Sequence, residues 1–220
     1  MITVVTLNWA RPNYTLINLH RYASYRIVKH VFCFNNGAPL PNPRELPKKC
    51  VIVEATRDLG LYSRLALASL ARTEAIFHTD DDLLVPEQTI NSLYSSWSRA
   101  QLSCHGTFGR IARPAYQQGD VFGRVEIVLT RAVVCSRRVN NVALTATERL
   151  EDLVAEPHGN GEDIVLSFAA MALSRVPNFA YRLPIHEYQI QDNLAIHRRW
   201  THHFEHRRRV ASRCRKLFLL

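Results

Sequence analysis

The stretch "EAIFHTDDDLLVP" (residues 74–86) places three adjacent aspartates, Asp80, Asp81 and Asp82, directly behind a short apolar run. Carboxylates that lie side by side repel one another, and a hydrophobic neighbourhood stabilises their charges far less well than water does. In open parallel sheets, however, ligands bind in the crevice outside the carboxyl ends of the strands. We therefore interpret residues 75–79 as a buried strand and the aspartates as part of a ligand crevice.

The segments on both sides of this stretch alternate between strand-like and helix-like patterns. Before the aspartates, β-branched and aromatic runs predict strands in residues 2–7, 26–35 and 50–55, and apolar residues at helical spacing predict helices in 14–25 and 61–72. After them, the pattern predicts a helix from Pro86, strands in 106–114, 124–136 and 178–185, an apolar helix in 164–174 and a terminal helix in 200–217. This alternation predicts an α/β fold, a mostly parallel central sheet flanked by helices, in a single domain over residues 1–220.

Length and composition are typical of one such domain. The chain has 220 residues, of which 47% are hydrophobic, and this is enough to bury a sizeable core. No run approaches the roughly 18 apolar residues of a transmembrane segment, and no basic and then apolar leader begins the chain. The five cysteines are scattered without a CxxC pair, as expected for reduced thiols. We therefore expect a cytoplasmic location.

The net charge of +9 is unevenly placed. The segment 197–216, "HRRWTHHFEHRRRVASRCRK", is rich in arginine and has Glu205 as its single acid. Such a segment could bind nucleic acid, anionic lipid, a polyanionic substrate or the phosphates of a small ligand. Composition alone does not decide among these partners.

The three aspartates are compatible with one crevice if a divalent cation lies between them and an anionic ligand. On an extended chain Asp80 and Asp82 point to the same side, so one could meet the metal while the other holds a nearby hydroxyl. The alternative is a solvated acidic turn before the helix at Pro86. An EF-hand is disfavoured because its sixth position, which needs glycine, would be Val85.

The stretch "NGED" (160–163) is a second candidate site. Glu162 and Asp163 would lie in the first turn of an apolar helix, where the helix dipole favours negative charge. Helix capping is therefore one interpretation. The other is that a carboxylate beside a glycine-lined opening acts as a base, as a nucleophile or in positioning an acceptor.

The third candidate is "HHFEHRRR" (202–209), in which His202 and His206 share one helical face. With Glu205 they form H-x-x-E-H, a pattern of inverted zincins, but those enzymes need a further acid downstream and this chain has none after Glu205. We favour a cationic face in which His206 and one of the arginines 207–209 bind phosphates. A solvated basic helix is the alternative.

In this order, the motifs resemble the GT-A fold glycosyltransferases, and most closely the exostosin-like family, glycosyltransferase family 64. That family is similar in having D-D-D after a strand, then V-L-T-G-A, then N-C-[DE]-D-I-A and a terminal H-x-x-E-H with arginines. The counterparts here are Asp80–Asp82, "VLTRAVV" (128–134), "NGEDIVLSFAA" (160–170) and residues 202–217. The chain departs from the pattern at Arg131, which replaces the glycine of V-L-T-G-A.

The resemblance implies a GT-A type, Rossmann-like domain whose residues 1–82 form the nucleotide-binding half and whose residues 83–220 form the acceptor half and the basic C-terminal helix. It implies a metal-dependent, retaining transfer of a hexosyl or N-acetylhexosaminyl group from a UDP-sugar to a glycan or another hydroxyl acceptor. Mn²⁺ or Mg²⁺ would be held by Asp82 and Asp80. The residues implied in donor binding are Asn8, Arg11, Asn35, Arg64, Asp80, Asp81, Asn160 and His206, and those implied in catalysis are Asp163, Glu162 and Arg209.

Two functions from other classes remain as alternatives. A metal-dependent phosphohydrolase of nucleotides or nucleotide sugars shares the metal and the phosphates, whereas a polyanion-binding module would use the basic segment and leave both acidic motifs unexplained. The positive charge suits an acidic glycan acceptor, and nucleic acid is not the expected partner. A peripheral membrane contact, a homodimer and a truncated Golgi-type domain are left open.

Overall fold

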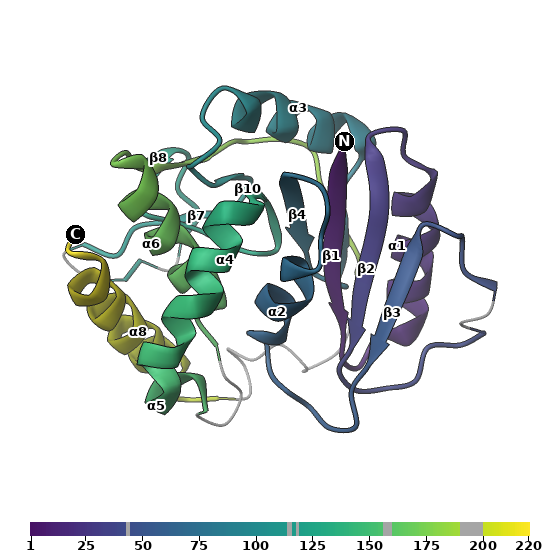
Figure 1. Cartoon of the computed structure of the whole chain (residues 1–220), viewed down its shortest axis with the longest axis horizontal. Coiled ribbons are helices and arrows are strands. Elements are labelled where there is room, and N and C mark those ends of the chain that lie inside the picture. Colours follow the sequence, from purple (N-terminus) through teal and green to yellow (C-terminus); the bar gives the residue numbers. More distant parts are fainter. Residues whose placement is uncertain (43–44, 114–115, 118, 156–159, 190–199) are drawn as a thin grey trace.

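The N-terminal run of β-branched and aliphatic residues forms the central strand of the sheet, β1 (Ile2–Asn8), which is buried along its whole length. The structure, a computed structural model, describes residues 1–42, 45–113, 116–117, 119–155, 160–189 and 200–220 (Figure 1). Its main sheet has the strand order β3-β2-β1-β4-β10-β6-β11-β8. The other strands are β2 (Val28–Asn35), β3 (Cys50–Glu54), β4 (Ala75–Thr79), β6 (His105–Gly106), β8 (Gly123–Val125), β10 (Ala132–Ser136) and β11 (Asn178–Ala180).

Strands β3, β2, β1 and β4 are parallel neighbours. Their carboxyl ends therefore meet at one edge of the sheet, where a ligand crevice is expected. Strand β10 reverses the direction, because it pairs antiparallel with both β4 and β6. Four of the seven strand pairs in the described part of this sheet are parallel. The prediction of an α/β fold with a mostly parallel sheet flanked by helices is confirmed.

Alternate side chains of the strands point into two separate hydrophobic cores. Val5 and Ile76 face the core shared with α2 (Ser63–Ser69), α4 (Arg137–Ala146), α6 (Glu162–Ser174) and α8 (His203–Phe218). Val4 and Phe77 face the core shared with α1 (Pro12–Ser24) and α3 (Glu87–Ser98). The sheet is thus the middle layer of three, and the helices surround it on both faces (Figure 1).

Two helices begin at residues whose backbone preference explains the boundary. Pro12 occupies the first turn of α1, where its missing N–H removes no helical hydrogen bond. Gly161 precedes α6 with φ at 117°, a conformation that other residues rarely adopt. A Cβ at Gly161 would also lie 3.1 Å from Val210 and 3.2 Å from the Tyr62 hydroxyl. The glycine of "NGED" therefore lets α8 and the start of α2 approach α6 closely.

Three predicted strands are shorter or more broken than the sequence indicated. The predicted strand 106–114, of which residue 114 lies outside the described residues, overlaps the end of β6 and contains β7 (Gly109–Arg110). The predicted strand 124–136 overlaps β8 and contains β9 (Ile127–Val128) and β10. The predicted strand 178–185 ends at Ala180. Two small sheets, β12 (His186–Glu187) with β5 (Leu83–Leu84) and β7 with β9, lie beside the main one.

The segment 137–155, for which the sequence pattern predicted no helix or strand, is mostly helical. It contains α4, a 3₁₀ turn (Thr147–Leu150) and α5 (Glu151–Val154). The Ser136 hydroxyl accepts a hydrogen bond from the backbone N of Val139 at 3.2 Å and so caps α4. All five cysteines are free thiols. Within the described residues, no helix has the length and apolar composition needed to cross a membrane.

Asn178 ties the edge of the sheet to α6, and its removal should destabilise the fold. Its amide donates to the carbonyls of Glu126 and Ser167, at 2.8 and 3.0 Å, and accepts from the backbone N of Cys104 at 2.9 Å. Asn178→Ala leaves these buried groups without their partner, so we expect a loss of about 3 kcal/mol in the free energy of unfolding. Urea denaturation measures it. The exposed Asn141→Ala should change stability by less than about 0.5 kcal/mol, and equal losses in both variants would contradict this role.

Candidate active site

The three aspartates follow β4 at the carboxyl edge of the sheet. Asp81 and Asp82 lie in a turn before β5, so the extended conformation assumed from the sequence is wrong. Each aspartate instead faces a different arginine. The ion pairs are Arg64 with Asp80 at 2.7 Å, Arg11 with Asp81 at 3.0 Å and Arg131 with Asp82 at 3.7 Å.

Arg64 joins the aspartate turn to the "NGED" segment. The side chain is 2% exposed, and its Nε lies 3.7 Å from a Glu162 oxygen while its Nη2 lies 2.7 Å from Asp80. Its Nη1 donates to the Thr130 carbonyl at 3.1 Å. Burial lowers the pKa of Arg64, but the charges of Asp80 and Glu162 outweigh burial and raise the pKa above its usual value. One charged guanidinium therefore brings Asp80 and Glu162, which are 82 positions apart in the sequence, into one site.

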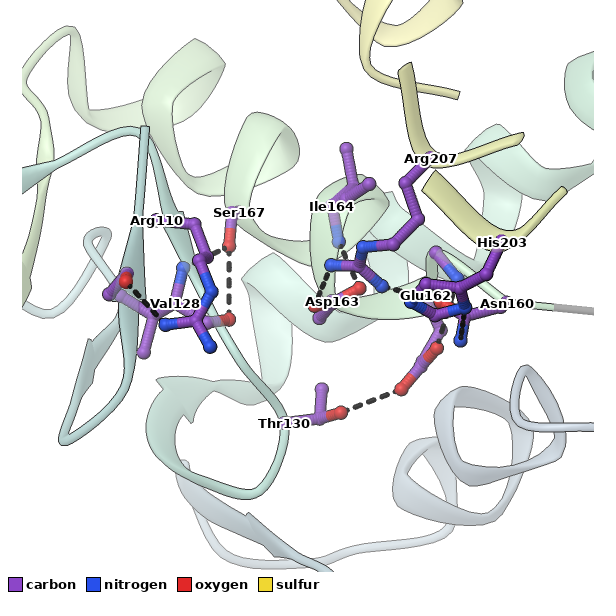
Figure 2. A network of polar contacts seen from close by, with 12 residues as sticks. Arg110, Val128, Thr130, Asn160, Glu162, Asp163, Ile164, Ser167, His203 and Arg207 are labelled. Carbon is purple, nitrogen blue, oxygen red and sulfur yellow. Dashed lines mark hydrogen bonds and ion pairs between the residues drawn. The ribbon is translucent and has the colours of Figure 1, made fainter. Parts of the chain in front are cut away.

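Glu162 is buried at the start of α6, and its carboxylate accepts a hydrogen bond from the Thr130 hydroxyl at 2.6 Å (Figure 2). Burial and the neighbouring charge of Asp163 raise the pKa of Glu162, although Arg64 opposes the rise. Helix capping alone does not describe this residue, because its side chain contacts groups outside its own helix. Thr130, which lies between β9 and β10, belongs to the quoted stretch "VLTRAVV" (128–134), but its contact with Glu162 was not predicted.

Asp163 is held in place by Arg207 of the terminal helix α8 (Figure 2). Arg207 of α8 donates to Asp163 Oδ2 at 2.6 Å and also to the Asn160 side chain. The backbone N of Ile164 donates to Asp163 Oδ1 at 2.9 Å. The Arg207 guanidinium also stacks over the Tyr116 ring, 4.8 Å from its centroid. Both oxygens of the carboxylate are engaged, so its orientation is fixed.

The basic segment divides between the site and the surface. His206 is buried, with Nε2 2.7 Å from the Asn160 carbonyl oxygen, and Arg207 is buried against Asp163. Arg209 is exposed, so the arginine that contacts Asp163 is Arg207, and the catalytic role of Arg209 stays a prediction. The positions 197–199 of this segment lie outside the described residues.

Asn8 and Asn35 end two parallel strands and are buried side by side. Asn8 Nδ2 donates to Asn35 Oδ1 and to the Ala38 carbonyl, both at 2.6 Å, and Thr15 donates to Asn8 Oδ1 at 3.0 Å. Asn35 in turn donates to Glu54 at 2.6 Å. The hydrogen-bonding groups of the Asn8 side chain are thus all paired within the chain, so this residue holds the ends of β1 and β2 in position.

The charges at the aspartate turn are compatible with a divalent cation. Burial raises the pKa of Asp81 to about 7 although Arg11 opposes it, and the charges of Asp80 and Asp82 add to the rise. Burial and the charge of Asp80 also raise the pKa of Asp82, whose Oδ1 is buried and lacks a hydrogen-bond partner in the described part of the chain. A cation at Asp82 would satisfy this oxygen and reduce the repulsion. The donor set of carboxylate oxygens suits Mg²⁺ or Mn²⁺.

The described residues alone do not supply a complete set of metal ligands. Among the described residues, no group of three or more His, Cys, Asp or Glu side chains could enclose an ion. Mg²⁺, however, is usually bound by one or two carboxylates together with the phosphates of a substrate. Asp80 and Asp82 fit that pattern, in which the ligand completes the coordination.

Two further residues at the site, Arg131 and Tyr62, have no role predicted from the sequence. Arg131 lies between Asp82 and Glu187, which is 3.2 Å from it. Tyr62 lies beside Gly161, and its hydroxyl is buried without a hydrogen-bond partner among the residues described. An open cavity of about 630 Å³ lies elsewhere, between α4 and the end of α8, and is lined by none of the predicted site residues.

The chain matches one protein family over almost its whole length. The family "Glycosyl transferase family 64 domain" matches residues 2–219. The chain therefore belongs to glycosyltransferase family 64. None of the curated proteins matches the chain by sequence.

Solved structures show the same fold at low sequence identity. A mannosyltransferase from Pyrobaculum calidifontis, PcManGT, solved in complex with GDP-Man and Mn²⁺, is 15% identical with a TM-score of 0.55, and the match covers 82% of this chain and 54% of that one. TarS residues 1–349 from S. aureus is 10% identical with a TM-score of 0.56, over 85% of this chain and 59% of that one. This chain thus spans little more than half the length of either structure. The fold is that of the GT-A glycosyltransferases.

The pair of Arg207 and Asp163 gives a stability test of the site. Arg207→Gln leaves Asp163 buried without its counter-charge, so we expect a loss of about 3–5 kcal/mol in the free energy of unfolding. Adding Asp163→Asn to this variant should recover much of the loss, because the unpaired charge is removed. Urea denaturation of the single and double variants measures both effects. Arg208→Gln, an exposed neighbour on α8, is the matched control, and a loss no larger than its loss would contradict the pairing.

Proposed function

We propose that the chain is a metal-dependent, retaining glycosyltransferase that uses a UDP-sugar. The observation that carries the proposal is the position of Arg64, which contacts Asp80 at 2.7 Å and approaches Glu162 to 3.7 Å. The aspartate turn and the start of α6 therefore border one site at the carboxyl edge of the sheet. We further propose that residues 1–82 bind the nucleotide and that residues 83–220 bind the acceptor within one domain.

In this proposal Asp82 and Asp80 hold Mn²⁺ or Mg²⁺ against the diphosphate of the donor. When bound, the ion supplies positive charge that stabilises the leaving diphosphate more strongly as the sugar–phosphate bond breaks. Asp81 is oriented by Arg11 at 3.0 Å and approaches the donor. Asn8 and Asn35 set the shape of the strand ends on which uridine rests.

Asp163 is the carboxylate we place next to the anomeric carbon. Arg207 and the backbone of Ile164 hold it in one orientation, so its negative charge requires no reorganisation during the reaction. It either stabilises the oxocarbenium-like centre or acts as a transient nucleophile, as carboxylates do in glycosidases. In front-face transfer the bond from the anomeric carbon to the phosphate oxygen breaks, the acceptor oxygen bonds to the same face, and the acceptor proton goes to the departing diphosphate.

The remaining residues of the site support this step. Asn160 and Glu162 position the donor or the acceptor, and His206 and Arg209 stabilise the leaving diphosphate. The acceptor is a glycan or another hydroxyl compound, and the net charge of +9 favours an acidic one. Uridine is proposed from the family resemblance. Because PcManGT was solved with GDP-Man, guanosine is the nucleotide that a test must include.

Ligand-dependent thermal stability tests the donor site. At about 100 times its dissociation constant, UDP with Mn²⁺ should stabilise the fold by about 2.7 kcal/mol and raise Tm by roughly 5–10 °C. Asp82→Ala should abolish the part of this shift that depends on Mn²⁺, whereas Asp152→Ala, at an exposed residue of α5, should retain it. A larger shift with GDP would show the nucleotide to be wrong. Indifference to every nucleotide, with and without the metal, would contradict the transferase.

Turnover of UDP-sugars tests the role of Asp163. Loss of a fixed charge aimed at the reacting centre should lower kcat by at least about 100-fold in Asp163→Asn, measured as UDP release in the presence of acceptors. Asp152→Asn is the control. A loss of only a few-fold would make the catalytic assignment wrong. Release of UMP and sugar phosphate in place of UDP would identify the phosphohydrolase instead.

A further inference from the structure

Arg131 and Glu187 form a charged pair beside the carboxylate proposed to hold the metal. Arg131 Nη2 lies 3.2 Å from Glu187 Oε1 and 3.7 Å from Asp82 Oδ1. The first distance permits a charge-assisted hydrogen bond, whereas the second is too long for one. The guanidinium therefore forms its closer ion pair with Glu187 and a longer one with Asp82.

Two further contacts fix the position of this pair. The Arg131 guanidinium stacks over the Phe108 ring, 4.5 Å from its centroid, which limits how far it can move. Glu187 belongs to β12, which pairs with β5 immediately after the aspartates, and the backbone N of Tyr188 donates to the Asp82 carbonyl at 3.0 Å. The backbone of Glu187 is thus held at the same turn as Asp82.

The Asp82 carboxylate is left incompletely satisfied by this arrangement. Its Oδ1 has no hydrogen-bond partner among the described residues, although a cationic group is near. The other charged groups that act on it are Asp80 and Glu187, which repel it, and Arg11, which attracts it. A guanidinium bonded directly to Oδ1 would compete with a divalent cation for the same oxygen.

We propose that Glu187 holds Arg131 away from Asp82, and that this pair of positioning residues sets the affinity of the site for its divalent cation. The inference rests on the proposed function, because it assumes a metal at Asp82. Glu187 acts through Arg131: without Glu187, the guanidinium moves onto Asp82 and blocks the metal. Without Arg131, Glu187 has little effect on the metal.

Mn²⁺ binding measured by the loss of the electron paramagnetic resonance signal of the free ion tests the proposal, with and without UDP. Arg131→Gln should bind Mn²⁺ about tenfold more tightly, because a positive charge within a few ångströms of the ion is removed. Glu187→Gln should bind it about threefold to tenfold more weakly. Arg138→Gln and Glu148→Gln, which make the same charge changes at exposed positions, should bind like the wild type. Arg131→Lys, which keeps the charge, should stay within about threefold of the wild type.

The double variant Arg131→Gln with Glu187→Gln separates the proposal from a simple sum of charges. If Glu187 acts through Arg131, the double variant binds Mn²⁺ as tightly as Arg131→Gln, within about twofold. If the two charges act independently, their effects cancel and the double variant resembles the wild type, which overturns the inference. An Arg131→Gln variant that binds no more tightly than Arg138→Gln also overturns it.

The metal-dependent function and the role of the Arg131–Glu187 pair are contradicted by different results. A wild-type chain that binds no Mn²⁺, even with UDP, contradicts the metal-dependent function and the inference with it. Normal Mn²⁺ binding together with additive effects in the double variant contradicts the inference alone.

Discussion

The buried guanidinium of Arg64 is the interaction on which the site depends. It lies between Asp80, Glu162 and the Thr130 carbonyl, and so connects the parallel half of the sheet to α6. A buried charge is costly unless it is paired and hydrogen-bonded. Arg64 meets this condition only when the aspartate turn and the "NGED" segment lie together. The free-energy cost of removing the Arg64 charge from water therefore favours the arrangement in which both acidic motifs lie at the same site.

A second buried arginine completes the site from the C-terminal helix. Arg207 holds Asp163, as Arg64 holds Asp80, and it reaches the carboxylate from α8 (Figure 2). The basic segment is therefore more than a charged surface, because its inward residues are part of the site, whereas Arg208 and Arg209 are exposed. This division weakens the alternative of a polyanion-binding module, which would leave Arg207 and His206 without a reason to be buried.

The sequence predicted those features that depend on local chemistry. The apolar run before Asp80 could be recognised as a strand, and the glycine before Glu162 could be placed at a helix start, because periodicity and backbone preference are local properties. The helix α4 was missed because its buried face, formed by Val139, Asn140, Ala143 and Ala146, consists mainly of small or polar residues. The strands around Gly106 and Gly109 were overestimated. Each glycine lies so close to a neighbouring backbone that a Cβ would clash at 2.4 and 2.2 Å.

The long-range pairs could not be predicted. The sequence shows three consecutive arginines at 207–209, and only the packing of α8 against α6 decides that Arg207 faces Asp163. Similarly, Arg131 stood out as a departure from a family motif, but its contacts with Glu187 and Phe108 come from β12 and from the loop after β6. Such contacts depend on how distant elements dock, which single-residue patterns do not encode.

In the proposed function, the carboxyl edge of the sheet binds a nucleotide diphosphate and a divalent cation between the aspartate turn and α6. X-ray diffraction at the manganese absorption edge, from crystals grown with UDP and Mn²⁺, tests it most directly. We expect an anomalous peak in contact with the Asp82 carboxylate and the diphosphate, with the uridine at the ends of β1 and β2. A nucleotide and metal bound away from the aspartates, for example in the cavity between α4 and α8, would contradict it.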